Sequence, residues 1–355
     1  MLTGPQVIVV ATPVFLALIG LEAWLAHRRG LRVYRLNDAL SSIGLGVMSQ
    51  VVGLFATLFT IGLYTLAHRH LALFELSASS PWVWLGALLA YDFCYYGLHR
   101  GGHRVALLWA AHAVHHQSED YNLSTALRQT SSGFLLAWLF YLPMAVAGVP
   151  PLVFASVALI DLLYQFWVHT QLVGKLGWFD RWFCSPSNHR VHHAVNDRYL
   201  DKNYGGILIV WDRLFGTYAE EDDAEPCVYG TRSALRSWNP VTANLQVYGQ
   251  LVADSRHATR WPDKLRVWLK PPGWRPADVA ARWPRAAFSL DDVQRFDPPL
   301  SRSSGRAAVA LFAAALTTTA LLLWQAQTWP VAAALAAAAV IVAALWGVAR
   351  LTTPR

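Results

Sequence analysis

The stretch Tyr91–His116 reads YDFCYYGLHRGGHRVALLWAAHAVHH, and it passes from apolar residues into closely spaced histidines. It holds an HxxxH pair and an HxxHH triplet, and a second HxxHH triplet follows in Ser185–His193, SPSNHRVHH. Because positions i, i+3 and i+4 of a helix share a face, each triplet is predicted to aim its imidazoles at one point. Packing does not explain eight histidines in three such groups, namely His99, His103, His112, His115, His116, His189, His192 and His193.

The composition is that of a polytopic membrane protein. Of the 355 residues, 55% are hydrophobic and 14% are charged, against about 25% charged in soluble domains. The apolar residues gather in blocks of bilayer-spanning length. Basic cytoplasmic loops explain the net charge of +7 better than nucleic-acid binding does. Cys94, Cys184 and Cys227 have no CxxC spacing, so the sequence indicates neither a disulfide framework nor an iron–sulfur cluster.

The apolar blocks predict seven membrane spans, with the N-terminus outside and the C-terminus inside. The loop HRRGLRVYR after the first block is assigned to the cytoplasm by the positive-inside rule. The span count then places all the histidine motifs on that same side of the membrane. The predicted spans cover approximately residues 6–26, 40–67, 82–99, 133–149, 152–168, 307–324 and 331–348.

The predicted fold is an all-α membrane helical bundle with a histidine-rich cytoplasmic helical cap that holds a di-metal site. Residues 1–90 would form the first two spans and the start of the third, and residues 91–220 would form the catalytic core with a transmembrane hairpin at 133–169. Residues 221–306 are expected to be cytoplasmic, and residues 307–355 to form a C-terminal transmembrane hairpin.

The histidine set points to redox-active metals. Neutral imidazole suits iron, zinc, copper and nickel, and the set exceeds the four ligands of a structural zinc site. It is about enough for two metals that keep open positions, and His169 is a plausible ninth ligand because the span count places it at the same membrane face. Paired iron suits O2 activation, whereas zinc suits hydrolysis. The absence of HExxH and GxSxG motifs favours redox chemistry.

Several polar residues near the histidines are further candidates. Asp92 and Asp161 lie within predicted spans, where a carboxylate either bonds the second nitrogen of a ligand histidine or pairs with polar groups between helices. The sequence leaves both alternatives open. Tyr121 and Asn122 follow the first triplet in a polar stretch, and Glu119 either adjusts the charge of the site or caps a helix.

The motifs HRGGH, HAVHH and HRVHH, in this order and spacing, resemble the fatty acid hydroxylase/sterol desaturase superfamily of membrane di-iron enzymes. Within it, LWAAHAVHHQSEDYNLSTALRQT and DKNYGGILIVWDRLFGTY are similar to the alkylglycerol monooxygenase subgroup. The resemblance implies two iron ions on the eight motif histidines and on His169. It also implies hydroxylation of the ether-bearing carbon of an alkylglycerol by O2 and tetrahydrobiopterin, with collapse to a fatty aldehyde and glycerol. Asn188 stands where some members have a further histidine.

The sequence contains no HPGG haem motif, dinucleotide fingerprint or cysteine cluster. We therefore expect electrons from an external donor, either a pterin or a redox protein. A sterol or fatty acid hydroxylase or desaturase of the same superfamily is an alternative, as is a non-catalytic membrane metal-binding protein. The expected location is a bacterial cytoplasmic membrane, with the metal site facing the cytoplasm.

Overall fold

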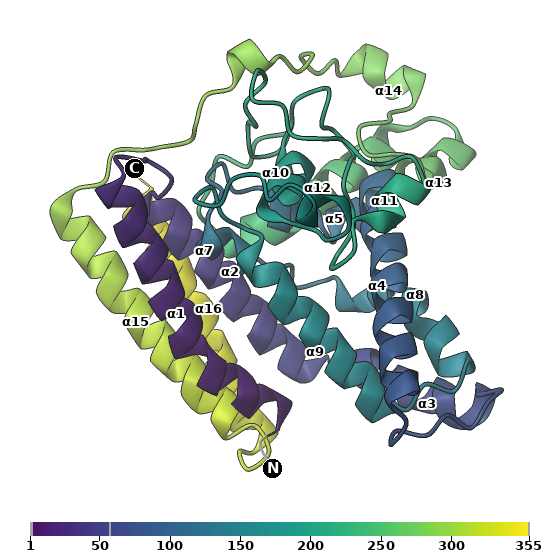
Figure 1. Ribbon diagram of the computed structural model, residues 1–355. Coiled ribbons are helices and arrows are strands. Elements are labelled where there is room, and N and C mark those ends of the chain that lie inside the picture. The colour runs from purple at the N-terminus through teal and green to yellow at the C-terminus, as the bar shows by residue number, and fades with distance from the viewer. Residues whose placement is uncertain (1–2, 57, 354–355) are drawn as a thin grey trace.

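The computed structural model describes residues 3–56 and 58–353, and its regular elements within these ranges are helices (Figure 1). Four of them are long and apolar enough to cross a membrane. They are α1 (Gly4–Arg28), α2 (Leu36–Phe55), α15 (Arg302–Trp324) and α16 (Val331–Thr352). The protein is therefore an all-helical membrane protein, as its composition predicts.

These four helices pack side by side into one bundle (Figure 1). Leu40 and Val47 of α2 meet Phe312 of α15 and Ile341 and Leu345 of α16 in a buried apolar core. Helices α15 and α16 form the predicted C-terminal hairpin, and their alanine-rich faces allow close approach.

A second group of helices contains α3 (Leu63–Leu71), α4 (Pro81–Arg104), α8 (Phe134–Val146) and α9 (Pro151–Trp167). Tyr64, Tyr141 and Val153 lie in its core. The turn between α8 and α9 requires glycine, because Gly148 has a φ of +86° and a Cβ there would lie 1.9 Å from the carbonyl oxygen of Phe74. Both helices of the predicted hairpin form and pack on α4, but each is shorter than the helices long enough to cross a membrane, so their membrane crossing stays a prediction.

The structure differs from the predicted spans at two places. The segment 40–67 is divided, because α2 ends at Phe55 and the π-helical turn η1 (Leu58–Gly62) precedes α3. The third predicted span is part of α4, whose second half carries Asp92, two histidines and two arginines and falls short in apolarity. Length and apolarity thus support four spans of the seven.

The remaining helices form a cap at one end of the bundle (Figure 1). This cap consists of α5 (Ala106–Ala110), α6 (Ala113–His116), α7 (Leu123–Ala126), α10 (Pro186–His193), α11 (Val210–Leu214), α12 (Pro240–His257), α13 (Trp261–Leu269) and α14 (Ala277–Arg282), with the short 3₁₀ turns η2 (Phe179–Arg181) and η3 (Leu290–Asp292). The C-terminal ends of α4 and α9 enter the cap, so every histidine motif lies at this end of the molecule.

Candidate metal centre

The nine histidines singled out in the sequence meet in two neighbouring clusters. Within each cluster, one nitrogen from every ring lies within 4.8 Å of the others. All the rings are buried except that of His112, which is partly buried. The first cluster contains His99, His103, His112, His116 and His192, and the second contains His115, His169, His189 and His193.

The prediction that each triplet aims at one point is wrong. His112 and His116 belong to the first cluster, while His115 between them belongs to the second. In the other triplet, His189 and His193 belong to the second cluster, while His192 between them belongs to the first. Successive helical residues are rotated by about 100°, so positions i+3 and i+4 point to opposite sides of position i. Each triplet therefore joins the two clusters and holds them next to each other.

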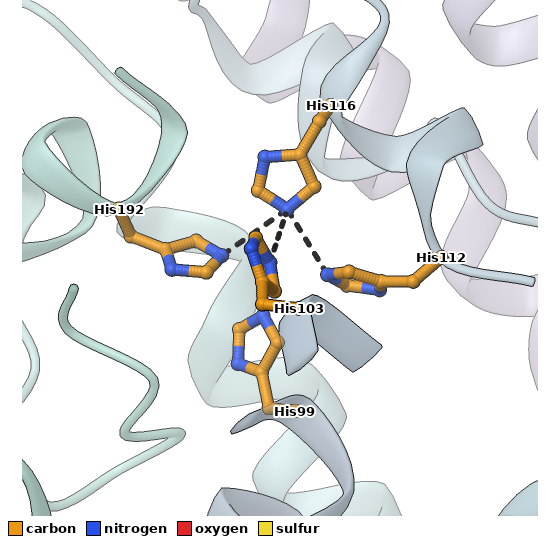
Figure 2. A group of neighbouring side chains, drawn as sticks. All are labelled: His99, His103, His112, His116 and His192. Atoms are coloured by element: carbon orange, nitrogen blue, oxygen red, sulfur yellow. Dashed lines mark hydrogen bonds between the residues drawn. The ribbon is translucent and has the colours of Figure 1, made fainter. Parts of the chain in front are cut away.

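The first cluster has the spacing of ligands around a metal ion. The Nε2 atom of His116 lies 3.2 Å from that of His103, 3.0 Å from that of His112 and 3.2 Å from that of His192 (Figure 2). A single imidazole N–H donates to one acceptor, so hydrogen bonding does not account for three such contacts. Ligands about 2.1 Å from an octahedral ion are separated by about 3.0 Å, which agrees with these distances. The ring of His99 points into the same space, and its buried Nε2 has no hydrogen-bond partner among the described residues (Figure 2).

The second cluster repeats this arrangement. The Nε2 atom of His169 lies 3.2 Å from that of His115 and 3.1 Å from that of His189. The Nε2 atom of His193 lies 3.2 Å from that of His189. The structure thus brings His169, from the end of α9, together with histidines of α6 and α10. The two donor sets fit two metal ions.

Backbone carbonyls fix the orientation of four of these rings. The Nδ1 atoms donate to carbonyl oxygens at 2.8–2.9 Å, which assigns the proton to Nδ1 and leaves the Nε2 lone pair facing inward. The pairs are His99 with Tyr204, His115 with Arg128, His169 with Gln165, and His192 with Lys202. The Nδ1 atom of His103 instead lies 3.4 Å from a carboxylate oxygen of Asp201.

Burial keeps the rings of the cap neutral. It lowers the pKa of His115 to about 4, because a buried imidazolium loses its hydration. Burial, followed by the charge of neighbouring rings, also lowers the pKa of His116 and of His193. Neutral imidazole is the form that coordinates metals.

The loop that supplies the carbonyls of Lys202 and Tyr204 was not identified as part of the site from the sequence. Asp201 and Asn203 adopt φ angles of 57° and 58°, a region that aspartate and asparagine tolerate better than most residues. The side chain of Asn203 donates to the carbonyls of Asn188 and Ala219, which ties the loop to α10. The Asp, Asn and Gly residues of DKNYGG were the available signal for such a backbone.

The carboxylates of Asp92 and Asp161 accept hydrogen bonds from the segment that follows this loop and from α9, respectively. Asp92 accepts hydrogen bonds from the backbone N–H groups of Ile207 and Leu208 and from the indole of Trp211. Asp161 accepts a hydrogen bond from the side-chain amide of Gln165, and the backbone carbonyl of the same residue orients His169. Neither carboxylate bonds a cluster histidine, so the structure selects pairing with polar groups from the two alternatives.

Of the other candidates, Tyr121 lies against the cluster. Its ring centroid is 5.2 Å from that of His193, and its hydroxyl donates to the carbonyl of Val168 at 2.9 Å. The remaining three hold the chain around the site. Asn122 caps α7, Asn188 donates to the carbonyls of Asp180 and Phe183, and Glu119 accepts from the backbone of Phe296.

An apolar cavity of about 330 Å³ reaches the centre from the membrane bundle. It touches the clusters at His112, His115 and His169. Polar groups lie near this end. Gln129, which follows Arg128, and Gln165 line the cavity, and the backbone carbonyls of Arg128 and Gln165 orient His115 and His169. The rest of the wall is mainly apolar side chains of α1, α2, α9 and α15, among them Phe15, Val47, Phe166 and Leu323, and Asp161 and Gln50 also line it.

A second cavity, of about 710 Å³, reaches the centre from the cap. It touches the clusters at His103, His116, His192 and His193. Its other lining residues include charged and amide side chains of the cap.

Comparison with known proteins gives consistent matches over this region. The fatty acid hydroxylase family model matches residues 84–217. The chain is 38% identical to alkylglycerol monooxygenase of Homo sapiens over 85% of this chain and 67% of that protein. It is 40% identical to alkylglycerol monooxygenase of Danio rerio over 77% of this chain and 60% of that protein. It is also 27% identical to ornithine lipid hydroxylase OlsE of Rhizobium tropici over 48% of this chain and 53% of that protein.

The chain thus spans about two thirds of the length of the human relative. No solved structure matches it.

Proposed function

Because the chain belongs to the fatty acid hydroxylase family, we propose that it is a membrane di-iron monooxygenase acting on the ether-bearing carbon of an alkylglycerol. The observation that carries this proposal is the meeting of the two histidine clusters with an apolar cavity in the membrane bundle. A hydroxylase for lipid chains needs both features at one place, and the matching relatives named alkylglycerol monooxygenase specify the ether lipid.

We assign the nine cluster histidines as the metal ligands and iron as the metal. Sets of five and four neutral imidazoles suit divalent first-row metals, and neither cluster contains a cysteine from the described part of the chain, which favours iron over a structural zinc site. Iron bound there would supply the O2-dependent redox chemistry.

In this proposal the apolar cavity binds and orients the lipid. Phe15, Val47 and Leu323 would surround the alkyl tail and exclude water from it. The amides of Gln129 and Gln165 would face the ether and the head group, because they line the end nearest the histidines. The carbon bonded to the ether oxygen would then lie next to His112, His115 and His169.

The reaction inserts one oxygen atom into the C–H bond of that carbon and reduces the other to water. The product is a hemiacetal, which breaks its bond to the ether oxygen to give a fatty aldehyde and free glycerol. Tetrahydrobiopterin or a redox protein would supply the two electrons.

We further propose that α4, α8 and α9 also enter the membrane, which gives seven spans with the cap in the cytoplasm. The basic residues Arg28, Arg29 and Arg32 at the cap end of α1 support this orientation. The corresponding location is a bacterial cytoplasmic membrane.

The test is turnover by purified, iron-loaded protein in lipid nanodiscs with a 1-O-alkylglycerol, O2 and tetrahydrobiopterin. We expect fatty aldehyde and glycerol in equal amounts, loss of activity in His116→Ala and retained activity in His257→Ala. His257 is a matched control because it lies outside both clusters, stacked on Trp283 at the exposed end of α12. Conversion of fatty acids or sterols to a stable alcohol or an alkene, with no aldehyde, would instead support the other activities of the superfamily.

A further inference from the structure

We propose that the cavity of the cap binds a small, planar, water-soluble electron donor, so that donor and lipid reach the histidines from opposite sides. We call it the polar cavity for its charged and amide side chains, although apolar side chains line much of its wall. This inference rests on the proposed function, because only a reductive oxygenase needs the donor. It concerns the cavity of about 710 Å³ beside His103, His116 and His192.

The two cavities meet different histidines. The apolar cavity touches His112, His115 and His169. The polar cavity touches four other histidines, His103, His116, His192 and His193. Each cavity contacts members of both clusters. The metal centre therefore forms part of the wall between two separate compartments.

The charges of the polar cavity make it unsuitable for an alkyl chain. Asp254 is buried and binds Arg275 at 3.0 Å and Arg285 at 2.9 Å, and all three residues line the cavity. The amides of Gln246 and Gln250 line it as well. An alkyl chain would remove the exposed Arg285 and the partly exposed amides from water without offering them hydrogen bonds, which is unfavourable. A polar ligand replaces the lost water contacts.

Aromatic rings in the same cavity favour a planar ligand. Trp109 lines it with its ring centroid 5.0 Å from that of His103 and 5.5 Å from that of His116. Trp274 and Phe288 line other parts of the wall. Flat rings among charged and amide groups suit a heteroaromatic molecule, which stacks through its faces and forms hydrogen bonds through its edge.

The volume of the cavity favours a small-molecule donor over a redox protein. A volume of about 710 Å³ is typical of sites for small molecules and cofactors. It does not admit a folded domain, so a protein donor would have to act from outside the cap.

The proposed reaction defines what this donor must deliver. One C–H bond and one O2 become one C–OH group and one water, which consumes two electrons and two protons per turnover. A donor that gives up two hydrogen equivalents supplies both and leaves in its oxidised form. Because the lipid fills the apolar cavity during the reaction, the donor needs an approach of its own.

A matched pair of substitutions tests this division. Gln250→Trp on α12 places a ring in the polar cavity, and Ala158→Phe on α9 places one in the apolar cavity. We expect Gln250→Trp to raise the KM for tetrahydrobiopterin at least tenfold and leave the KM for the alkylglycerol unchanged. Ala158→Phe should raise the KM for the lipid alone. The proposal would be overturned if Gln250→Trp changed the KM for tetrahydrobiopterin and the KM for the alkylglycerol equally. It would also be overturned if reduced ferredoxin supported turnover and Gln250→Trp left that turnover unchanged.

Binding measured without turnover separates this inference from the proposed function. Dihydrobiopterin and oxidised flavin mononucleotide are titrated into nanodisc-embedded protein while tryptophan fluorescence is followed, because Trp109 and Trp274 line the cavity. Binding that Gln250→Trp abolishes and Ala158→Phe preserves supports the donor site even if no lipid is converted. Absence of binding by both probes, or binding that Gln250→Trp leaves intact, overturns it even if lipid is converted.

Discussion

Replacement of Gly206 by alanine tests how the loop after α10 orients the metal centre. An added Cβ would lie 2.8 Å from a carboxylate oxygen of Asp161, 2.9 Å from one of Asp92 and 2.9 Å from the ring of Tyr95. These atoms belong to α4 and α9, and Asp92 is held by three hydrogen bonds, so they have little freedom to move. Overpacking of this kind costs about 1–3 kcal/mol in stability.

The consequence for the metal follows from the position of Gly206 in the chain. Relief of the clash moves the loop, and the carbonyl of Tyr204, two residues earlier, accepts the 2.8 Å hydrogen bond that orients His99. Loss of such an outer contact lowers metal affinity by about ten- to a hundredfold. We therefore expect Gly206→Ala to release iron at a correspondingly lower chelator concentration and to unfold at a lower temperature.

The matched control is Gly174→Ala, in an exposed loop where an added Cβ has no atom within 4 Å. Iron retention is followed by absorbance and elemental analysis during chelator titration, and unfolding is followed by a thermal scan in the same detergent. Iron retention in Gly206→Ala equal to that of the wild type and of the control would refute the assigned role of this loop.

Three further predictions follow from the site. His115→Ala should lower iron affinity in the same cluster as His169→Ala does, and not in the cluster affected by His116→Ala, as measured by Mössbauer spectra of the single variants. Tyr121→Phe should destabilise the protein by about 0.5–1.5 kcal/mol through loss of the hydrogen bond to Val168, with turnover within a few-fold of wild type, as measured by thermal unfolding and aldehyde release. The metal-free protein should become more stable as the pH rises from about 4 to about 6.5, because the unfolded chain binds a proton at His115 in this range and the folded chain does not, and unfolding midpoints across that range test it.

The sequence was sufficient to find the histidines of the two clusters but not their division between them. Spacing identified eight histidines, and the span count added His169, which lies in the second cluster. Each triplet is divided because the side chains at positions i+3 and i+4 point to opposite sides of position i. Two clusters form only when the two triplets face each other in the folded chain. That relation between distant segments is not visible in either motif alone.

Backbone groups were the least predictable part of the site. The carbonyls of Lys202, Tyr204, Gln165 and Arg128 orient four rings, and any residue type carries a carbonyl. The span prediction was limited in a related way. Hydropathy did not reveal the break between α2 and α3, because η1 is as apolar as the helices that it separates.

The most direct test of the central claim is the iron content of the protein purified from iron-replete cells, measured together with its Mössbauer spectrum. Two histidine clusters joined through both triplets predict two iron ions per chain with a magnetically coupled spectrum, unchanged in His257→Ala. One metal ion per chain, or two zinc ions that ferrous iron does not replace on reconstitution, would contradict a di-iron centre.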